Sequence, residues 1–482
     1  MKRLFEINAV LIATIICMSL SFSVYAGERD KKAITLQYFI NQSRANYPNF
    51  KKNKLENEIA LSKLNAAEAV KDAIAKIALN KTSLKPIPEN NVNVTDYDSS
   101  SAEVSFGKKS LKSGADINIG AGLLSTDKEF SNGIEKNYLN PYVHLQFNQP
   151  LLENWLGLLY RLPIEREKLK TTIVSETAKE LDEFLISQLL KIFYDWVLFE
   201  KELAIYKKSY NNYLVLLEQA RRKNKSGLMD IDDLYRVEAE SLRYKKAIIV
   251  MEAKFKNQTN EIKKYMVGEY EGIKIYPEYD GEKDNFYASL RAGTAESTRK
   301  FKILKTAESA TKKDILAERE RGKPELNLSV SSKLLGYSSS KSLNGNLDYN
   351  DLRISLLFAR PFGNKAHKAD IKKLSAEGKK IKEDAEEFIL DYKYGLRNIK
   401  NQIAMHESLI GENKKIIDIT EKQLIVENKK FSRGRIDVFL LIETKNKLLN
   451  VNLELMQNKT NLLKFYSDYS DLTDQLYGLV NH

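Results

Sequence analysis

The sequence predicts an α+β protein that is mainly helical, with long antiparallel coiled-coil helices and four short strands. Three observations predict this class. Apolar residues recur with helical spacing over segments tens of residues long, four segments alternate apolar and polar residues with period two, and both patterns occur twice in the same order. With 482 residues, the chain exceeds the usual size of one domain. We therefore expect an internally duplicated architecture.

The N-terminal residues have the pattern of a secretory signal peptide. Lys2 and Arg3 give a basic start, residues 9–22 form an apolar core, and a small-residue cleavage motif ends at Ala26. The core is short for a membrane-spanning helix, which needs ~20 residues, although an uncleaved anchor is the alternative. We expect export and cleavage after Ala26. The only cysteine, Cys17, would then be removed, and the mature chain would have no disulfide.

The chain is basic, with 77 Lys and Arg against 65 Asp and Glu. A basic balance can indicate nucleic acid or acidic lipid as a partner. Here the charges are spread along segments with helical spacing, which is typical of solvated helix faces. An exported protein would also not meet nucleic acid. We therefore expect no nucleic-acid partner.

Four segments are predicted to be strands: residues 115–124, 140–150, 324–336 and 350–361. In the second and fourth segments, alternate apolar residues share one face, namely Val143, Leu145, Phe147, Ile354, Leu356 and Phe358. Period-two runs of this length suit transmembrane strands, which need ~9–11 residues, while a soluble sheet packed on one face is the alternative. Four strands cannot close a barrel, so the membrane interpretation requires several copies of the chain.

Two long helical hairpins are predicted, at about residues 165–266 and 365–476. In the first hairpin, apolar residues recur in steps of three and four from Leu181 through Trp196 to Leu217. In the last helix, leucine or tyrosine falls every seven residues, at Leu441, Leu448, Leu455, Leu462, Tyr469 and Leu476. This is a heptad pattern, and it predicts coiled-coil packing.

Each hairpin is predicted to turn at a glycine, within Ser226-Gly227-Leu228 and Arg433-Gly434-Arg435. Glycine adopts φ > 0 without strain, so it commonly follows the last residue of a helix. In the first turn Asp230 or Asp232, and in the second Asp437, fall where the next helix begins. A carboxylate there can cap free amide groups and interacts favourably with the helix dipole.

Three landmarks repeat at nearly one spacing along the chain. Asp116 precedes Glu325 by 209 residues. Phe147 and Gly227 precede their counterparts, Phe358 and Gly434, by 211 and 207 residues. The predicted parts are therefore a signal peptide at 1–26, a first structural repeat at 27–266, a linker at 267–285 and a second structural repeat at 286–482.

Residues 81–113 have no counterpart in the second repeat. They form a polar stretch without a clear period, and we interpret them as an irregular insertion. Pro150 and Pro361 end the second and fourth predicted strands, within "FNQP" and "FARP". Proline breaks a strand ladder and suits a turn or a first helical position, so both mark predicted strand-to-helix joints.

In these features the chain resembles the TolC-like outer-membrane efflux protein family. The resemblance rests on the duplicated plan of strand pair and helical hairpin, the "FNQP" and "FARP" joints, and the "SGL" and "RGR" turns followed by heptads. It implies a homotrimer in which each copy gives four strands to one twelve-stranded barrel in outer-membrane lipid. It also implies that the helices form an α-barrel across the periplasm, with residues 267–285 in a band around it.

The resemblance implies that the two glycine turns form the periplasmic entrance, where an adaptor protein docks and acidic residues line a constriction. Asp233 matches a tip acid of the family and Glu443 a constriction acid. The constriction candidates are Asp230, Asp232, Asp233, Asp437 and Glu443. Two positions depart from the family pattern: Leu440 stands where an acid is expected, and Ile436 near where an arginine is expected.

No pattern predicts an enzyme. The four histidines, at 144, 367, 406 and 482, are scattered without metal-ligand spacing, and no phosphate-binding or nucleophile motif is present. We expect no catalytic residue, cofactor or metal site. The expected function is a passive exit duct of a tripartite efflux or type I secretion system, served indirectly by an inner-membrane pump. The alternative is an exported, soluble coiled-coil scaffold.

Overall fold

The computed structural model describes residues 31–86, 94–268, 270, 273–279, 293–338 and 346–479. The predicted signal peptide with Cys17, part of the predicted linker and His482 lie outside these ranges. The chain divides into two compact units. The helical unit comprises Met1–Lys54, Lys179–Thr298 and Leu390–His482, and the sheet unit comprises Leu55–Ala178 and Arg299–Ile389.

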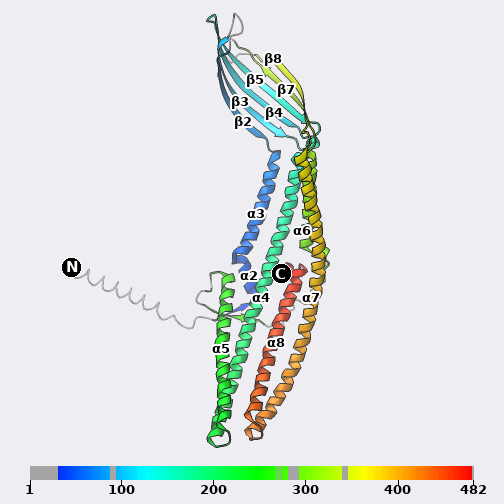
Figure 1. Ribbon diagram of the computed structural model, residues 1–482. Coiled ribbons are helices and arrows are strands. Elements are labelled where there is room, and N and C mark those ends of the chain that lie inside the picture. Colours follow the sequence, from blue (N-terminus) through cyan, green and yellow to red (C-terminus); the bar gives the residue numbers. More distant parts are fainter. Residues whose placement is uncertain are drawn as a thin grey trace, which may run out of the picture. The chain divides into compact units, whose positions relative to one another are not determined.

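The sheet unit contains one antiparallel sheet with the strand order β2-β3-β4-β5-β7-β8 (Figure 1). The strands are β2 (Ile74–Leu84), β3 (Val94–Lys109), β4 (Asp116–Phe130), β5 (Glu135–Pro150), β7 (Glu325–Leu335) and β8 (Tyr349–Ala359). The four predicted strands correspond to β4, β5, β7 and β8. The sheet therefore joins segments from both predicted repeats, through the pairing of β5 with β7.

The prediction that residues 81–113 are irregular was wrong. This segment contributes the end of β2 and all of β3, so the sheet has six strands rather than four. Serines and threonines are frequent at the end of β2 and the start of β3, where the composition is that of a loop. The apolar alternation is confined to the other end of the strand pair, at Ile77, Leu79, Val104 and Phe106. Pairing with β4 stabilises β3 as a strand, although the composition of β3 does not indicate one.

The predicted bounds of the first two strands, 115–124 and 140–150, were too short. Strand β4 continues to Phe130 and β5 begins at Glu135, which leaves a tight turn. Gly133 has φ +75° in this turn, a conformation that side chains with a Cβ rarely adopt. The equivalent segment of the second repeat, between β7 and β8, lies partly outside the described residues.

Two long helical hairpins are present, as predicted. They consist of α4 (Leu158–Lys225) with α5 (Ile231–Met266), and α7 (Lys365–Ser432) with α8 (Val438–Leu472). Helices α4 and α7 each contain 68 residues. Helix α8 ends before Leu476, which starts the short helix α9 (Leu476–Leu479). Among the described helices, none holds an apolar stretch that could cross a membrane.

The helical unit has a dense aromatic core. It is built mainly from α4, with α2 (Leu36–Asn46), α5 and the strands β1 (Lys31–Thr35) and β6 (Lys274–Glu278). Phe39, Phe193 and Trp196 are fully buried in it, and the Phe39 and Phe193 rings stack with centroids 5.9 Å apart. Strand β6 lies in the predicted linker and pairs in parallel with β1.

The predicted apolar seam of α4 is only partly correct. Leu181 is 48% exposed, whereas Ile186, Leu189 and Leu190 are buried. This part of α4 is apolar on more than one face, so its period alone does not identify the face that packs. In α8 the heptad prediction holds better, because Leu441, Leu455 and Tyr469 are buried.

Helices also pack within the sheet unit. These are α3 (Pro48–Glu68, from Leu55), the first part of α4, α6 (Arg299–Arg321) and the first part of α7. Ion pairs join α4 to α6: Glu165 with Lys313 at 2.6 Å, Arg166 with Asp314 at 3.3 Å, and Glu176 with Lys302 at 3.1 Å. These three pairs link the two helices along one interface, each contributing little by itself.

Candidate functional site

The sheet has one apolar face, which the pairing register defines. Because side chains alternate along a strand, residues paired across strands share a face, as do Ile77 with Val104 and Phe106 with Ile119. The exposed large apolar residues of this face are Ile77, Leu79, Val104, Phe106, Ile117, Ile119, Leu123, Val143, Leu145, Leu334, Leu352, Ile354, Leu356 and Phe358. Monomeric soluble proteins rarely expose contiguous patches of this extent, so the face is suited to contact with lipid or protein.

The opposite face of the sheet is polar. Tyr142 donates a hydrogen bond to Glu103 at 2.8 Å, His144 lies 3.8 Å from the same carboxylate, and the Lys333 ammonium lies 3.8 Å from the centre of the Tyr142 ring. These contacts join β3, β5 and β7 across the sheet. A surface of this kind suits water rather than lipid.

Two glycines of β4 make room for this polar network. A Cβ on Gly120 would lie 2.5 Å from the His144 ring, and one on Gly122 would lie 2.7 Å from the Tyr142 ring. Real Cβ atoms do not approach other atoms so closely, so the two rings can lie across β4 only because these positions are glycine. The two glycines of the segment "NIGAGLL" therefore allow the polar network to form across this strand.

The two hairpin turns have the same backbone geometry. Gly227 and Gly434 have φ +69° and +67°. The amide of Leu228 donates to the carbonyl of Lys223 at 2.8 Å, and the amide of Arg435 donates to that of Lys430 at 2.9 Å. This is the hydrogen bond of a Schellman motif. The predicted glycine-terminated turns are therefore present.

The predicted turn residues are exposed. Side chains and backbone are exposed throughout both predicted triplets, Ser226, Gly227, Leu228, Arg433, Gly434 and Arg435. Leu228 is 75% exposed, a high value for an apolar side chain. Both turns lie at the same end of the helical unit (Figure 1).

The helices after the turns are capped differently. Asp437 is the N-cap of α8, and its carboxylate accepts a hydrogen bond from the Phe439 amide at 2.7 Å. Asp230, rather than Asp232, holds the N-cap position of α5, but its side chain makes no capping hydrogen bond. Asp232 lies in the first turn of α5, where its charge still suits the helix dipole.

The acidic candidates of the two hairpins lie near each other. Burial raises the pKa of Asp233 above its usual value, and the charges of Asp437 and Asp232 raise it further. Arg236 acts in the opposite direction and lies 3.5 Å from Asp232 and 3.9 Å from Asp233. The sequence analysis missed Arg236, although its spacing of four residues from Asp232 is that of a helical ion pair.

Glu443 does not join this acidic group. It lies on the exposed side of α8, between buried Ile442 and Thr444, and is not among the charges that act on Asp233. Leu440 is 41% exposed. Ile436 packs against an apolar cluster near the two hairpin turns, which is described below. Within the described chain, neither Arg433 nor Arg435 forms an ion pair.

A shared apolar cluster joins the two hairpins near their turns. It includes Leu217 and Val237 of the first hairpin and Phe431, Val438 and Leu441 of the second. Lys223 donates a hydrogen bond to the Phe431 carbonyl, and its ammonium lies 4.4 Å from the centre of the Phe431 ring. The two turns are therefore held together by packing and by a cation–π contact.

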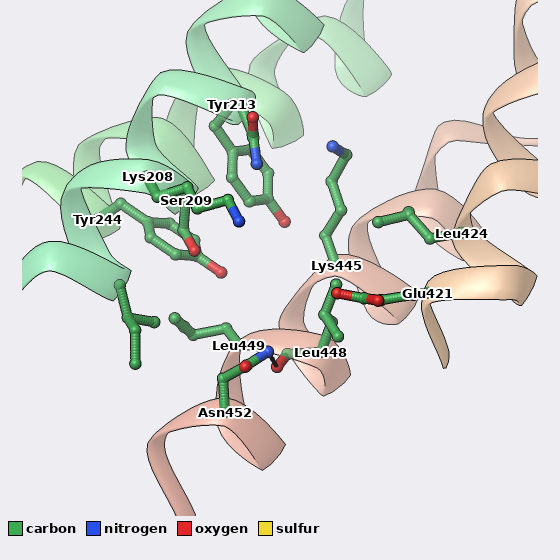
Figure 2. Close-up of a pocket in the computed structure, with 12 residues that line it drawn as sticks. Lys208, Ser209, Tyr213, Tyr244, Glu421, Leu424, Lys445, Leu448, Leu449 and Asn452 are labelled. Carbon is green, nitrogen blue, oxygen red and sulfur yellow. Dashed lines mark hydrogen bonds between the residues drawn. The ribbon is translucent and has the colours of Figure 1, made fainter. Parts of the chain in front are cut away.

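A pocket of about 130 Å³ lies beside this cluster, between the two hairpins. Figure 2 shows Tyr213 and Tyr244 on one side and Lys445, Leu449 and Asn452 on the other. Burial lowers the pKa of Lys445 and raises that of Tyr244 to about 12. Both tyrosines donate to the Asn446 side chain, at 3.1 and 2.7 Å. Neutral tyrosine hydroxyls thus bridge the hairpins over the working pH range.

The proline joints are placed near the strand ends, as predicted, but neither is a first helical residue. Pro150 is the last residue of β5 and lies opposite Asn327 of β7. Pro361 follows β8 by two residues. Helices α4 and α7 begin only at Leu158 and Lys365.

One group of three carboxylates in the described part of the chain is close enough to share a cation: Glu180, Glu183 and Asp474, within 4.8 Å. Glu183 is fully buried, and it accepts hydrogen bonds from the amides of Leu476 and Tyr477 at 2.6 and 3.1 Å. Its carboxylate therefore caps α9 against α4. Among the histidines, His406 bonds to Asn458 at 3.0 Å and His367 bonds to Glu318.

No protein-family profile and no curated protein sequence matches the chain. Solved structures do match it. CusC, described in terms of transmembrane channel formation, gives a TM-score of 0.66 at 14% identity, covering 94% of this chain and 95% of CusC. The outer-membrane channel OprN gives 0.68 at 11% identity, covering 92% and 90%. The outer-membrane channel MtrE of Neisseria gonorrhoeae gives 0.65 at 12% identity, covering 92% and 89%.

The chain therefore has the fold of the TolC-like outer-membrane efflux proteins. Its structural neighbours are channel proteins rather than enzymes. At these identities the likeness concerns the fold, and the function is argued from the surfaces of this chain.

Proposed function

We propose that the protein is an outer-membrane channel, the exit duct of a tripartite efflux or type I secretion system. The observation that carries this proposal is the two-faced sheet, with large apolar residues exposed on one face and a hydrogen-bonded polar network on the other. Transmembrane barrels have this alternation, with lipid outside and water inside. The fold shared with outer-membrane channels supports the same conclusion.

Aromatic residues at both ends of the sheet support a membrane location. Tyr349, which opens β8, is 60% exposed, and its ring lies 6.4 Å from that of Tyr337. At the other end, Trp155 is 45% exposed and Phe362 is 99% exposed. Aromatic side chains prefer the interfaces between lipid and water, where barrels carry girdles of them.

In this proposal the channel is a homotrimer in outer-membrane lipid, exported by a signal peptide cleaved after Ala26. The helical hairpins extend into the periplasm as an α-barrel, and an adaptor protein docks on the exposed turns around Gly227 and Gly434. An inner-membrane pump acts through the adaptor. The cargo is either a small toxic molecule or a secreted polypeptide. The inner-membrane pump, rather than the duct, selects between the two.

The proposed duplication at 27–266 and 286–482, with 267–285 as its linker, has support in the helix bounds. Leu158 and Lys365, which start α4 and α7, are 207 residues apart, and so are Ile231 and Val438, which start α5 and α8. The two glycine turns have the same spacing. Two equivalent hairpins per copy would let three copies form a quasi-sixfold helical wall.

Cell fractionation tests the proposal directly. A channel should sediment with outer membranes, need detergent for extraction and migrate as a heat-modifiable trimer on SDS gels. Purified trimers should give discrete conductance steps in planar bilayers. If osmotic shock releases the protein as a water-soluble monomer, the channel proposal is wrong and the coiled-coil scaffold remains.

Glu443 can be tested separately as a constriction residue. Three copies of this carboxylate in a ring would favour cations, so Glu443→Ala should raise single-channel conductance or weaken cation preference. Glu454→Ala is the matched control, since Glu454 is also exposed on α8 but lies further from the turn. Recordings identical to those of the unmodified channel would exclude Glu443 from the gate.

A further inference from the structure

The two edge strands of the sheet have no partner in the described chain. Strand β2 lies at one edge and β8 at the other (Figure 1). Each contains 11 residues, and every residue of both strands is exposed. Each strand thus presents a full row of backbone N–H and C=O groups for further pairing.

Both edges lack two of the features that prevent pairing in soluble sheets, namely proline and bulges, although β2 contains Lys76 and Lys81. On the apolar face, β2 presents Ile77 and Leu79, with Lys81 two residues further along, and β8 presents Ile354 and Leu356. Soluble proteins protect exposed edges with lysine, proline or bulges at such positions. In lipid, an unpaired edge would leave each backbone group without a hydrogen-bond partner.

We infer that β2 of one copy pairs with β8 of a second copy, so that three copies close an eighteen-stranded wall. This inference rests on the proposed trimeric channel. Three copies of six strands give eighteen, whereas the four strands predicted from the sequence give twelve. The hairpin of β2 and β3 makes the difference.

The directions and faces of the edges fit this closure. All neighbouring strands are antiparallel and their number is even, so β8 of one copy meets β2 of the next in the antiparallel direction. Residues of the apolar face are odd-numbered on β2 and even-numbered on β8. A register that places Leu79 opposite Ile354 therefore also places Ile77 opposite Leu356 and keeps all four side chains on one face.

The inference has a consequence for size. Barrel diameter grows roughly linearly with strand number, so an eighteen-stranded wall is about 1.5 times as wide as a twelve-stranded one. Barrels of about 16–18 strands leave an aqueous channel open at their centre. The polar network around Tyr142 would then line a wide vestibule rather than fill it.

Cysteine cross-linking tests the inference, because residues 27–482 contain no cysteine. The double variant Leu79→Cys/Ile354→Cys should form reversible disulfide-linked dimers and trimers when outer membranes are oxidised. Partner positions Leu352, Leu356 and Phe358 complete the scan of registers. Within one chain the two edges are five strand spacings apart, about 24 Å, so an intramolecular bond cannot form.

Two controls separate the outcomes. Leu79→Cys/Ser355→Cys places the thiols on opposite faces and should give about ten-fold less product. Ile119→Cys/Ile354→Cys tests a wall in which β4 meets β8 and the hairpin of β2 and β3 lies outside it. A conducting trimer that cross-links only through the second pair overturns the eighteen-stranded wall and leaves the channel intact. A water-soluble monomer without either cross-link overturns the channel as well.

Discussion

The helical unit has a buried apolar core, whereas one apolar face of the sheet is exposed. Ile186, Phe193 and Trp196 of α4 are fully buried. On the sheet, Leu79 is 76% exposed and Ile354 is 66% exposed. The helical unit therefore carries a core of its own, while the apolar face of the sheet depends on surroundings that a single chain does not supply. Within one chain, the helical unit shields its apolar core from water, and the sheet unit does not shield its apolar face.

The same contrast holds for polar groups. In the helical unit, buried polar groups form local links, such as Glu183 with the α9 amides and Asn446 with Tyr213 and Tyr244. In the sheet, the polar residues gather on one face and join neighbouring strands through Glu103 and Tyr142. A buried core and the lipid-facing wall of the proposed channel would place the same residue types in opposite directions.

The largest effect is expected in the core of the helical unit. Phe193→Ala should reduce the free energy of unfolding by about 3–5 kcal/mol, because it removes a fully buried ring that contacts Phe39 and Trp196. Urea unfolding followed by far-UV circular dichroism would measure it. Phe184→Ala in the same helix is the control, since Phe184 is 51% exposed. If both changes cost the same, a second copy covers the exposed side of α4.

A charge on the apolar face of the sheet should have the next largest effect. Leu145→Arg should destabilise the membrane-inserted protein by about 2–4 kcal/mol, because Leu145 lies within β5 on the apolar face, which would meet lipid in the proposed channel. Gln146→Arg, on the polar face, should change stability little. Urea titration in lipid vesicles would compare the two. Equal stabilities would mean that both faces of the sheet meet water, which would remove the contrast between the two units.

The two helix caps at the tip should differ by a smaller amount. Asp437→Ala should cost about 1 kcal/mol, because its carboxylate bonds the Phe439 amide. Asp230→Ala should cost less, since Asp230 makes no capping hydrogen bond. Hydrogen exchange in the first turns of α8 and α5 would resolve the difference. Equal protection losses in the two variants would contradict the capping geometry.

The smallest effect concerns pH. Because burial and neighbouring acids raise the folded-state pKa of Asp233, the folded tip binds this proton more tightly than the unfolded chain does. Tip stability should therefore be greatest below the unfolded-state pKa and should fall as pH rises through the folded-state pKa. Asp233→Asn should remove this dependence and stabilise the tip at neutral pH. Hydrogen exchange of α5 across this pH range would detect it, and an unchanged pH profile would contradict it.

The helical hairpins could be predicted from the sequence because their signals are local. Helical spacing and the glycines at 227 and 434 gave the hairpin turns and the approximate helix bounds. The strands with apolar alternation along most of their length were found for the same reason. The proximity of Asp233 to Asp437 could not be predicted locally, because it depends on two segments some 200 residues apart. The family resemblance implied only that acidic residues of both turns lie near one another.

The local sequence determined the periodic elements: long helices, glycine turns and four of the six strands. Periodicity and backbone preference act over a few residues, so they are visible in one segment at a time. Tertiary structure alone decided that residues 74–84 and 94–109 form two more strands and that Gly120 and Gly122 make room for the rings of His144 and Tyr142. It also decided which side of α4 is buried. These features depend on which segments become neighbours, because a strand rich in serine is stabilised by the strand beside it and a face becomes a core only when another element covers it.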